Sequence, residues 1–194
     1  MKKEDLRLKF KQIRREHLSA RDFDAAALKR NVKKAIADLG PKAQVCLYRP
    51  LSDEVGCDLA PLTDFYFPRI DGQNLQFFKP RSAKAFSKSR FGISEPIPEK
   101  SRALDLSQDI LVFCPAVAVD TLGTRLGMGK GYYDRFFHAN PRALRLALVL
   151  QAQVSKTVFM PDPWDQPVDW IVSEQMILKP SLKGVRSHGS QFAS

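Results

Sequence analysis

Short apolar runs, each bounded by residues typical of turns, fill the middle and later parts of the chain. They are rich in Val, Ile, Leu, Phe and Tyr and therefore favour β-strands. The predicted strands are residues 44–49, 65–70, 75–78, 109–114, 144–150 and 170–173. The runs 110–113 and 144–150 are apolar almost without interruption, which indicates strands covered on both faces. Asp71-Gly72, between the second and third strands, predicts a hairpin turn.

Ahead of the strands, the apolar positions follow the period of a helix. Leu6, Phe10 and Ile13 recur at helical spacing and predict the apolar edge of a first helix. A basic stripe on the adjoining face consists of Lys3, Arg7, Lys11 and Arg14. Such a stripe is more often a solvated face than a binding site, so its role depends on whether another anion-binding element lies beside it.

A second helix is predicted between two boundary signals. Ser19, with Asp22 three residues later, predicts a capping box at its start, and Gly40-Pro41 predicts its end. The buried face of this helix is expected to include Phe23, Leu28, Val32 and Ile36.

These elements predict an α/β fold in which helices flank a mixed, mostly parallel sheet in a single three-layer domain over residues 1–178. A chain of 194 residues suits one domain of this kind. Residues 179–194 form a basic C-terminal tail that we expect to be partly disordered.

The most distinctive segment, residues 120–135, combines glycine with basic residues between a predicted buried strand and a predicted helix. We expect Gly127, Gly129 and Gly131 to take positive φ angles and to expose bare N–H groups to a ligand. Positive charge is added by Arg125, Lys130 and Arg135. A helix beginning near Gly131 would point its positive end at the same place. The segment therefore predicts a polyphosphate-binding loop at the carboxyl end of a central strand.

The glycine spacing matches neither of the two common nucleotide-binding fingerprints. No Ser or Thr follows Lys130, and the glycines fall on alternate residues rather than in a G-x-G-x-x-G pattern. On the glycines alone, a tight turn between strand and helix is an equal alternative. The basic residues favour the binding loop, as does Asp134, whose carboxylate oxygens suit Mg²⁺.

Charge and cysteine content narrow the class of protein. The chain carries 31 Lys and Arg against 21 Asp and Glu, a formal net charge of +10, which predicts anionic partners. Cys46, Cys57 and Cys114 form no C-x-x-C pair, so we expect buried thiols in a reducing cytoplasm rather than disulfides or a zinc site. We also expect neither a secretory signal nor a membrane span, because no apolar stretch is long enough.

Two further segments have the composition of loops. Residues 91–98 start with Phe91 and are equally consistent with a lid over a flat ligand and with a surface connection. Residues 161–169 combine three prolines with three carboxylates, a composition that is too rigid for random coil and too acidic for a core.

Residues 125–135, Arg-Leu-Gly-Met-Gly-Lys-Gly-Tyr-Tyr-Asp-Arg, resemble the signature of the 5-formyltetrahydrofolate cyclo-ligases, also called methenyltetrahydrofolate synthetases. Weaker matches follow the order of this family along residues 3–174. They are Lys3-x-x-Leu6-Arg7, Arg14-Arg15 before Leu18-Ser19, Ser52-Asp-Glu-Val55, Phe67-Pro-Arg-Ile70, Phe91-Gly-Ile-Ser-Glu-Pro96 and Pro167-Val-Asp-Trp-Ile-Val-Ser-Glu174.

The resemblance implies an enzyme that uses ATP and Mg²⁺ to convert 5-formyltetrahydrofolate to 5,10-methenyltetrahydrofolate, releasing ADP and phosphate. Phosphorylation of the formyl oxygen would turn a poor leaving group into a good one, and N10 would then attack the formyl carbon. Positioning and charge stabilisation would be the main tasks of the protein. The implied partners are small-molecule folates, including polyglutamylated ones, with no nucleic acid or membrane. We expect a monomer.

The resemblance also implies roles for particular residues. Those at the ATP would be Lys3, Arg7, Arg125, Leu126, Gly127, Met128, Gly129, Lys130, Gly131, Tyr132 and Tyr133. Those at the folate would be Arg49, Glu54, Phe91, Gly129, Lys130 and Tyr132, with Glu54 facing the N–H edge of the pterin and Phe91 stacking on its rings. Catalytic roles would fall to Lys130, Tyr132 and Arg125, which would stabilise developing negative charge. Asp134 and Asp162 would hold Mg²⁺, with Asp165 as the alternative to Asp162.

The chain departs from the pattern of the family in one place. Only thirteen residues separate Glu54 from Pro68, near the minimum for a parallel crossover that includes a helix. We expect the helix of the family to be shortened or replaced by residues 59–62, with the pterin pocket reshaped. This departure supports an alternative, a cyclo-ligase-like relative that binds ATP but has a different folate substrate or none. A nucleic-acid-binding protein is a third possibility, disfavoured because no aromatic residues interleave with the basic stripe.

Overall fold

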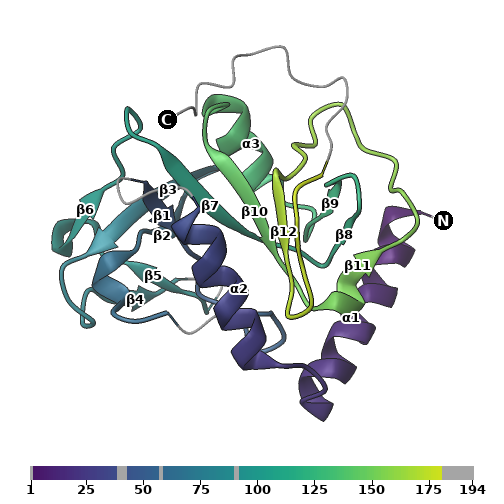
Figure 1. Cartoon of the computed structure of the whole chain (residues 1–194). Helices are drawn as coiled ribbons and strands as arrows, with labels where there is room; N and C mark the ends of the chain where they lie inside the picture. The colour runs from purple at the N-terminus through teal and green to yellow at the C-terminus, as the bar shows by residue number, and fades with distance from the viewer. Residues whose placement is uncertain (1, 39–42, 57–58, 90–91, 181–194) are drawn as a thin grey trace.

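The computed structural model of the chain describes residues 2–38, 43–56, 59–89 and 92–180. A five-stranded sheet lies at its centre (Figure 1). The strands run in the order β1 (Gln44–Cys46), β7 (Ile110–Pro115), β10 (Leu144–Leu148), β12 (Trp170–Val172) and β13 (Ile177–Leu178). The first four are parallel, and β13 pairs antiparallel with β12. The predicted mixed, mostly parallel sheet is confirmed.

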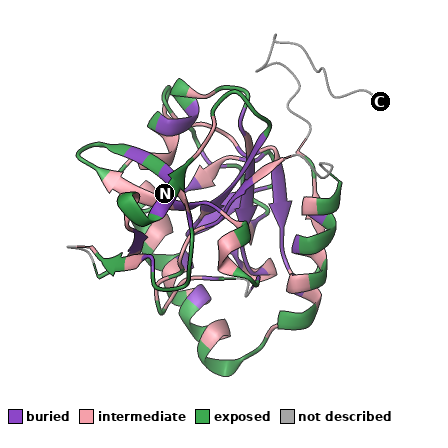
Figure 2. Cartoon of the chain, turned by 90° about the vertical axis from the view of Figure 1, so that its left-hand side faces the viewer, coloured by how far each residue is buried: buried purple, intermediate pink, exposed green. Residues whose placement is uncertain are grey.

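Both faces of this sheet are covered, as the uninterrupted apolar runs predict. Side chains of a strand alternate between the two faces. On β7, Leu111 and Phe113 therefore pack toward helix α2 (Ala25–Ala37), whereas Val112 packs toward helix α3 (Tyr132–Ala139). Figure 2 shows buried strands at the centre and helices that are exposed on their outer sides.

Smaller sheets and single turns of 3-10 helix surround the central sheet. One sheet has the order β11 (Val154–Ser155), β8 (Ala118–Asp120) and β9 (Arg125–Leu126). A second has the order β2 (Phe67–Asp71), β3 (Asn74–Pro80) and β6 (Ser101–Ala103), and a third consists of β4 (Phe86–Lys88) and β5 (Ser94–Pro96). The 3-10 turns are Leu62–Asp64, Pro98–Lys100 and Gln151–Gln153. The predicted hairpin is confirmed, since Gly72 lies in the turn between β2 and β3 with a φ of 59°.

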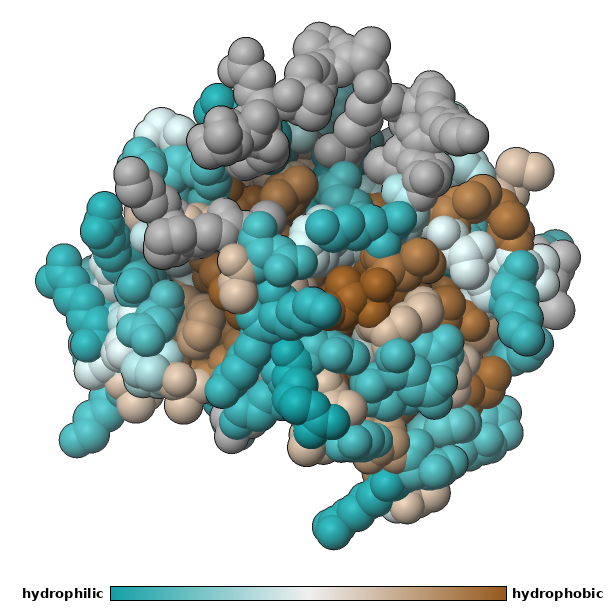
Figure 3. Space-filling view, in the orientation of Figure 1, coloured by the Kyte–Doolittle hydropathy of each residue, from teal (hydrophilic) through white to brown (hydrophobic). Residues whose placement is uncertain are grey.

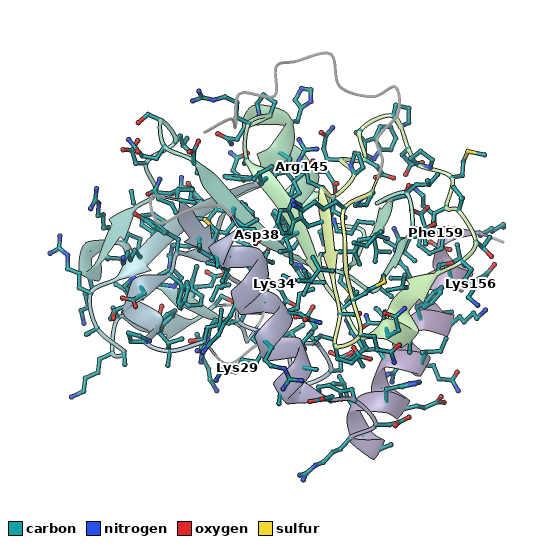
Figure 4. The ribbon with its side chains drawn as sticks, in the orientation of Figure 1. Lys29, Lys34, Asp38, Arg145, Lys156 and Phe159 are labelled. Atoms are coloured by element: carbon teal, nitrogen blue, oxygen red, sulfur yellow. The ribbon has the colours of Figure 1, made fainter. Side chains whose placement is uncertain are left out.

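Helix α1 (Lys3–Ala20) packs against the sheet formed by β8, β9 and β11 rather than on the central sheet (Figure 1). Its apolar edge of Leu6, Phe10 and Ile13 is confirmed, because these side chains meet the buried residues of that small sheet. The ring of Phe10 contacts that of Phe159 edge-on, with 6.1 Å between centroids. Phe159 is labelled in Figure 4 on the side where α1 lies. None of the described helices is long and apolar enough to cross a membrane.

The predicted capping box of the second helix is wrong. Ser19 belongs to α1, which ends only at Arg21, whose backbone is left-handed with a φ of 52°. Helix α2 begins later, after Asp24, whose Oδ1 accepts a hydrogen bond from the Ala27 N–H at 2.8 Å. Both Ser19 and Asp24 are good capping residues, and the sequence pattern selected the one inside the first helix. The predicted stop at Gly40-Pro41 lies outside the described residues, and α2 ends at Ala37.

The connection between Glu54 and Pro68 is short, as predicted. Within its described residues it contains one 3-10 turn, Leu62–Asp64, slightly later than the expected 59–62. The chain then runs beside β1. The backbone N–H of Tyr66 donates to Val45 O at 2.9 Å, and the backbone oxygen of Tyr66 accepts from the Leu47 N–H at 2.8 Å. A parallel neighbour for β1 is thus reached without an α-helix among the described residues.

The cysteines agree with the expected buried thiols as far as the described residues extend. Cys46 and Cys114 are buried and free. Burial raises the pKa of Cys114 to about 12, which leaves the thiol protonated and unreactive at neutral pH. Cys57 and most of the tail 179–194 lie outside the described residues.

Candidate active site

A cavity of about 1100 Å³ opens at the carboxyl end of the central sheet. Its walls come from α1, the glycine segment, the start of α3, the loop after β1, the β2–β3 hairpin and residues 162–165. Every predicted site residue that the structure describes lines this cavity. Phe91 lies outside the described residues. Figure 3 shows hydrophilic side chains over much of one face of the molecule, with apolar residues between them.

Arg125 connects the glycine segment to the central sheet. The segment does not follow β7 directly, because β8 and β9 intervene, but Arg125 Nη1 donates to Pro115 O, at the end of β7, at 3.3 Å. Arg125 Nη2 also pairs with Asp134 Oδ1 at 2.9 Å. Burial acts to lower the pKa of Arg125, but Asp134 more than offsets this effect, so the pKa is raised and the guanidinium stays charged.

The glycines of the segment serve two different structural needs. Gly129 and Gly131 have φ angles of 85° and 67°, as expected. The positive φ expected at Gly127 is wrong. At that position a Cβ atom would lie 2.9 Å from Arg125 Nη1, so a larger residue would have to displace the Arg125 guanidinium. Helix α3 begins directly after Gly131, so its first N–H groups face the segment.

The basic stripe of α1 meets the glycine segment. Arg7 Nε donates to Gly127 O at 2.9 Å, and the Arg7 guanidinium lies 3.6 Å from the position that a Cβ atom would take at Gly129. Two elements more than a hundred residues apart therefore bring cationic groups and bare backbone to one wall of the cavity. This contact places the stripe beside the glycine segment, the neighbouring element on which its predicted role depends.

The acids expected to hold a metal each have a cationic partner. Lys3 Nζ lies 2.7 Å from Asp162 Oδ2 and 2.7 Å from Asp165 Oδ2. Burial acts to lower the pKa of Lys3, but its hydrogen bonds to these carboxylates outweigh burial and raise it. The Gln166 N–H donates to Asp134 Oδ1 at 3.2 Å and so joins the acidic loop to α3. Asp162 and Asp165 stand equally close to Lys3, and both remain candidates.

A further part of the cavity lining follows the end of β1. Glu54 Oε2 accepts a hydrogen bond from the Leu51 N–H at 3.0 Å, and burial raises the pKa of Glu54. The neighbouring Asp53 pairs with Arg14 of α1 at 2.9 Å, and Arg14 is only 1% exposed. Helix α1 therefore contacts both the glycine segment and the loop that carries Glu54. Arg49 in this part of the lining lies over the ring of Phe86, 5.5 Å from its centroid.

Several cavity residues were not predicted as site residues. They are Tyr48, Leu51, Pro68, Ile70, Leu75, Ile93, Glu95, Pro115, His138 and Trp164, whereas Arg135 was predicted to add charge to the glycine segment but was given no individual ligand. Arg135 and His138 are three residues apart on α3 and so lie on one helical face. That spacing was a usable signal, whereas the β2–β3 hairpin residues reach the cavity only through tertiary packing.

Fold and site together define a class: an α/β protein in which a glycine-rich segment and cationic side chains line a cavity at the carboxyl end of the central sheet. Comparison with known proteins narrows this class. The profile of the 5-formyltetrahydrofolate cyclo-ligase family matches residues 1–174. The chain belongs to this family, whose members are ATP-dependent ligases, and the resemblance stated from its motifs is confirmed.

Individual relatives agree with this assignment. The 5-formyltetrahydrofolate cyclo-ligase of Mycoplasma pneumoniae is 26% identical over 171 residues, which cover 85% of this chain and 96% of the relative. The solution structure of Aquifex aeolicus 5,10-methenyltetrahydrofolate synthetase has a TM-score of 0.68 and 28% identity, covering 99% of this chain and 98% of that one. A synthetase structure from Mycoplasma pneumoniae, at 20% identity, shares the fold with a TM-score of 0.66 and covers 90% of this chain and 99% of its own.

Proposed function

We propose that this protein catalyses the ATP-dependent cyclisation of 5-formyltetrahydrofolate to 5,10-methenyltetrahydrofolate, releasing ADP and phosphate. The observation that carries the proposal is the contact of Arg7 with the glycine segment in a cavity whose lining also includes Glu54. The cationic side chains and bare backbone around Arg7 suit a triphosphate, and the carboxylate of Glu54 suits the N–H groups of a pterin.

The proposed chemistry has two steps. The formyl oxygen attacks the γ-phosphorus of ATP, the bond from that phosphorus to the bridging oxygen breaks, and ADP leaves. N10 then attacks the formyl carbon, the carbon–oxygen bond breaks, phosphate leaves, and N10 loses its proton. Negative charge grows first on the transferred phosphoryl group and then on the departing phosphate. Lys130 and Tyr132, which line the cavity at the start of α3, would stabilise that charge, and Arg7 would contact the phosphates.

The carboxylates of the cavity fit Mg²⁺. This ion prefers oxygen ligands and usually takes one or two carboxylates together with phosphate oxygens and waters. Asp134 would supply one carboxylate, and Asp162 or Asp165, in the loop joined to Asp134 through Gln166, would supply another. When bound, Mg²⁺ would neutralise charge on the phosphates. Lys3, now shared between Asp162 and Asp165, would then be free to contact the triphosphate.

Glu54 is proposed to select the folate. A carboxylate accepts hydrogen bonds from the N–H groups on the edge of a pterin, and these charge-assisted bonds are stronger than neutral ones. The hydrogen bond from the Leu51 N–H holds Glu54 Oε2 in place. The Arg14–Asp53 pair fixes the loop that carries Glu54 against α1.

A second candidate function is that of a cyclo-ligase-like relative with a different folate substrate or none. The short connection between Glu54 and Pro68 favours it, because both of these residues line the cavity in which the pterin is proposed to bind. One assay separates the two candidates. Purified protein is mixed with 5-formyltetrahydrofolate and Mg-ATP, and the near-ultraviolet absorbance of the methenyl product is followed. Product that appears only with ATP supports the cyclo-ligase, whereas ATP binding without product supports the relative.

A lysine substitution tests the proposed catalytic role. Lys130→Met removes a cation from the cavity, so we expect turnover to fall at least tenfold, about 1.4 kcal/mol in the barrier. Lys156→Met is the matched control, because Lys156 is exposed, lies outside the cavity lining and is labelled in Figure 4. Equal turnover by the Lys130 variant and the wild type would remove Lys130 from the reacting centre.

A further inference from the structure

One cationic side chain of the cavity is not explained by the proposed chemistry. The Lys and Arg residues of the lining are Lys3, Arg7, Arg49, Arg125, Lys130 and Arg135. Lys3 and Arg125 form ion pairs with carboxylates of the cavity. In the part of the chain that the structure describes, no carboxylate lies within ion-pair distance of the other four. In the proposed function, Arg7 and Lys130 contact the phosphates, and Arg49 lies near the pterin. Arg135 is then the one of these four that has no assigned ligand group.

Arg135 is held in a defined orientation although it is exposed. Its Nε donates to Gln73 O at 2.9 Å, in the turn of the β2–β3 hairpin. Its guanidinium carbon lies 5.1 Å from the ring centroid of Tyr132. Its Nη1 packs against Gly131, only 2.9 Å from the position that a Cβ atom would take there. Nε is thus engaged within the protein, whereas the Nη groups remain available for a ligand.

The surroundings of Arg135 are amphipathic. Ile70 and Leu75 of the hairpin supply an apolar wall to the same cavity, and His138 follows Arg135 by three residues on α3. The packing of Phe77 on Phe136, with 5.0 Å between ring centroids, fixes the hairpin against this helix. An apolar surface that ends in a preorganised guanidinium suits an extended ligand with an aromatic body and a carboxylate end.

We infer that this part of the cavity binds the p-aminobenzoyl-glutamate portion of the folate, with a glutamyl carboxylate paired to Arg135. The inference rests on the proposed function, because it assigns one end of the substrate of that reaction. The glutamate carries the only carboxylates of 5-formyltetrahydrofolate, and the aminobenzoyl ring is its extended apolar part. A guanidinium binds a carboxylate through two parallel hydrogen bonds, which accounts for an arginine at this position.

The test compares two substrates in one protein. 5-Formyltetrahydropteroate has the reacting atoms of 5-formyltetrahydrofolate but lacks the glutamate. We measure kcat/KM for both compounds with the wild type, with Arg135→Gln and with Arg142→Gln. Arg142 is an exposed arginine just beyond α3 that does not line the cavity, so it is the matched control.

The expected result is a loss of discrimination. In Arg135→Gln, the ratio of kcat/KM for the glutamate-bearing substrate to that for the glutamate-free substrate should fall about tenfold, the loss expected for one charged hydrogen-bonded pair. The ratio should stay at the wild-type value in Arg142→Gln, and the KM for ATP should be equal in all three proteins.

Other outcomes overturn the inference. A folding defect in Arg135→Gln would lower activity on both substrates equally and leave the ratio unchanged, which contradicts glutamate binding. A parallel rise in the KM for ATP would assign Arg135 to the nucleotide instead. If the wild type converted neither compound, the proposed function itself would fall, an outcome distinct from wild-type turnover with an unchanged ratio.

Discussion

At the scale of single residues, the three acids of the cavity that are candidates for Mg²⁺ binding already have cationic partners in the chain. Lys3 holds Asp162 and Asp165, and Arg125 holds Asp134. When a magnesium nucleotide binds, these ion pairs would therefore be replaced by new contacts. The carboxylates would bind the metal ion, and Lys3 would contact a phosphate. Each ion pair keeps a charged group in place before the ligand binds.

The ionised carboxylate of Glu54 is predicted to lower the free energy of unfolding and to strengthen folate binding. Burial raises its pKa, so the folded protein holds this proton more tightly than the unfolded chain does. The resulting contribution to stability is fully present below the unfolded pKa and is lost as the pH rises through the folded pKa. Glu54→Gln cannot ionise and keeps an acceptor for the Leu51 N–H. Relative to the wild type, this variant should gain free energy of unfolding between about pH 4 and about pH 8.

The same variant should bind folate about tenfold more weakly, since a charged acceptor becomes neutral, while its affinity for ATP is unchanged. Chemical denaturation at the two pH values and calorimetric titration with each ligand measure both effects. A stability difference that does not depend on pH would show that Glu54 keeps its ordinary pKa. Equal loss of both affinities would indicate a folding defect.

Most of the candidate site could be predicted from single residues, because many of its polar and glycine residues lie in one continuous stretch of sequence. Residues 125–134 are contiguous, and the family pattern placed Lys3, Arg7, Arg49 and Glu54 beside them. Ile70, Leu75 and Trp164 could not be found in this way. They are apolar residues like many others, and only the folding of their loops brings them to the cavity.

At the scale of elements, the length of a strand decided whether it could be predicted from the hydrophobic pattern. Strands such as β7 and β10 carry enough consecutive apolar residues to be recognised. Strands β9, β11 and β13 have two residues each, too few to show any period, and they were missed. The start of α2 was misplaced because Ser19 and Asp24 are both good capping residues, and the left-handed turn at Arg21 that separates the helices leaves no mark in hydrophobicity.

Gly123, in the turn that leads into β9, is predicted to be sensitive to substitution. Its φ is 87°, and a Cβ atom there would lie 2.6 Å from Val168 O. The same two residues are joined by a hydrogen bond from the Val168 N–H to Gly123 O at 2.8 Å. Gly123→Ala combines a left-handed backbone with a clash against backbone, so it should lower the free energy of unfolding by about 2–3 kcal/mol.

Gly72→Ala is the matched control. Gly72 also has a positive φ, 59°, but no atom lies within 4 Å of its Cβ position. Only backbone strain applies there, and we expect a loss of about 1 kcal/mol. Urea denaturation of both variants measures the difference. Equal losses would show that the contact with Val168 O is relieved at no cost.

At the scale of the whole molecule, the cavity forms where later segments of the chain pack against the N-terminal helix α1. Helix α1 does not cover the central sheet. It lies against β8, β9 and β11 and reaches the glycine segment, the loop after β1 and the acidic loop through Arg7, Arg14 and Lys3. A solved relative that covers nearly the full length of the chain has a TM-score of 0.68, so the overall fold that carries α1 is shared with that relative.

Trp164 provides a signal for ligand binding to the cavity. It lines the cavity between Asp162 and Asp165 and is 66% exposed, whereas the other tryptophan, Trp170, is 7% exposed. Binding of Mg-ATP should shield the Trp164 indole from water and shift its fluorescence to shorter wavelength, in a saturable manner. Trp164→Phe should abolish the shift. A shift of equal size in that variant would place the nucleotide away from residues 162–165.

The way in which the central sheet ends on each side has a consequence for the behaviour of concentrated solutions. On one side, the backbone of Tyr66 occupies the hydrogen-bonding groups of β1 at Val45 and Leu47. On the other side, β13 offers only two residues. An open strand edge is a template on which another chain adds a strand, and long exposed edges lead to aggregation. Because the described edges of the central sheet are either paired or short, they offer few backbone groups to which a strand of another molecule could add. We therefore expect little aggregation through this sheet during crystallisation and storage.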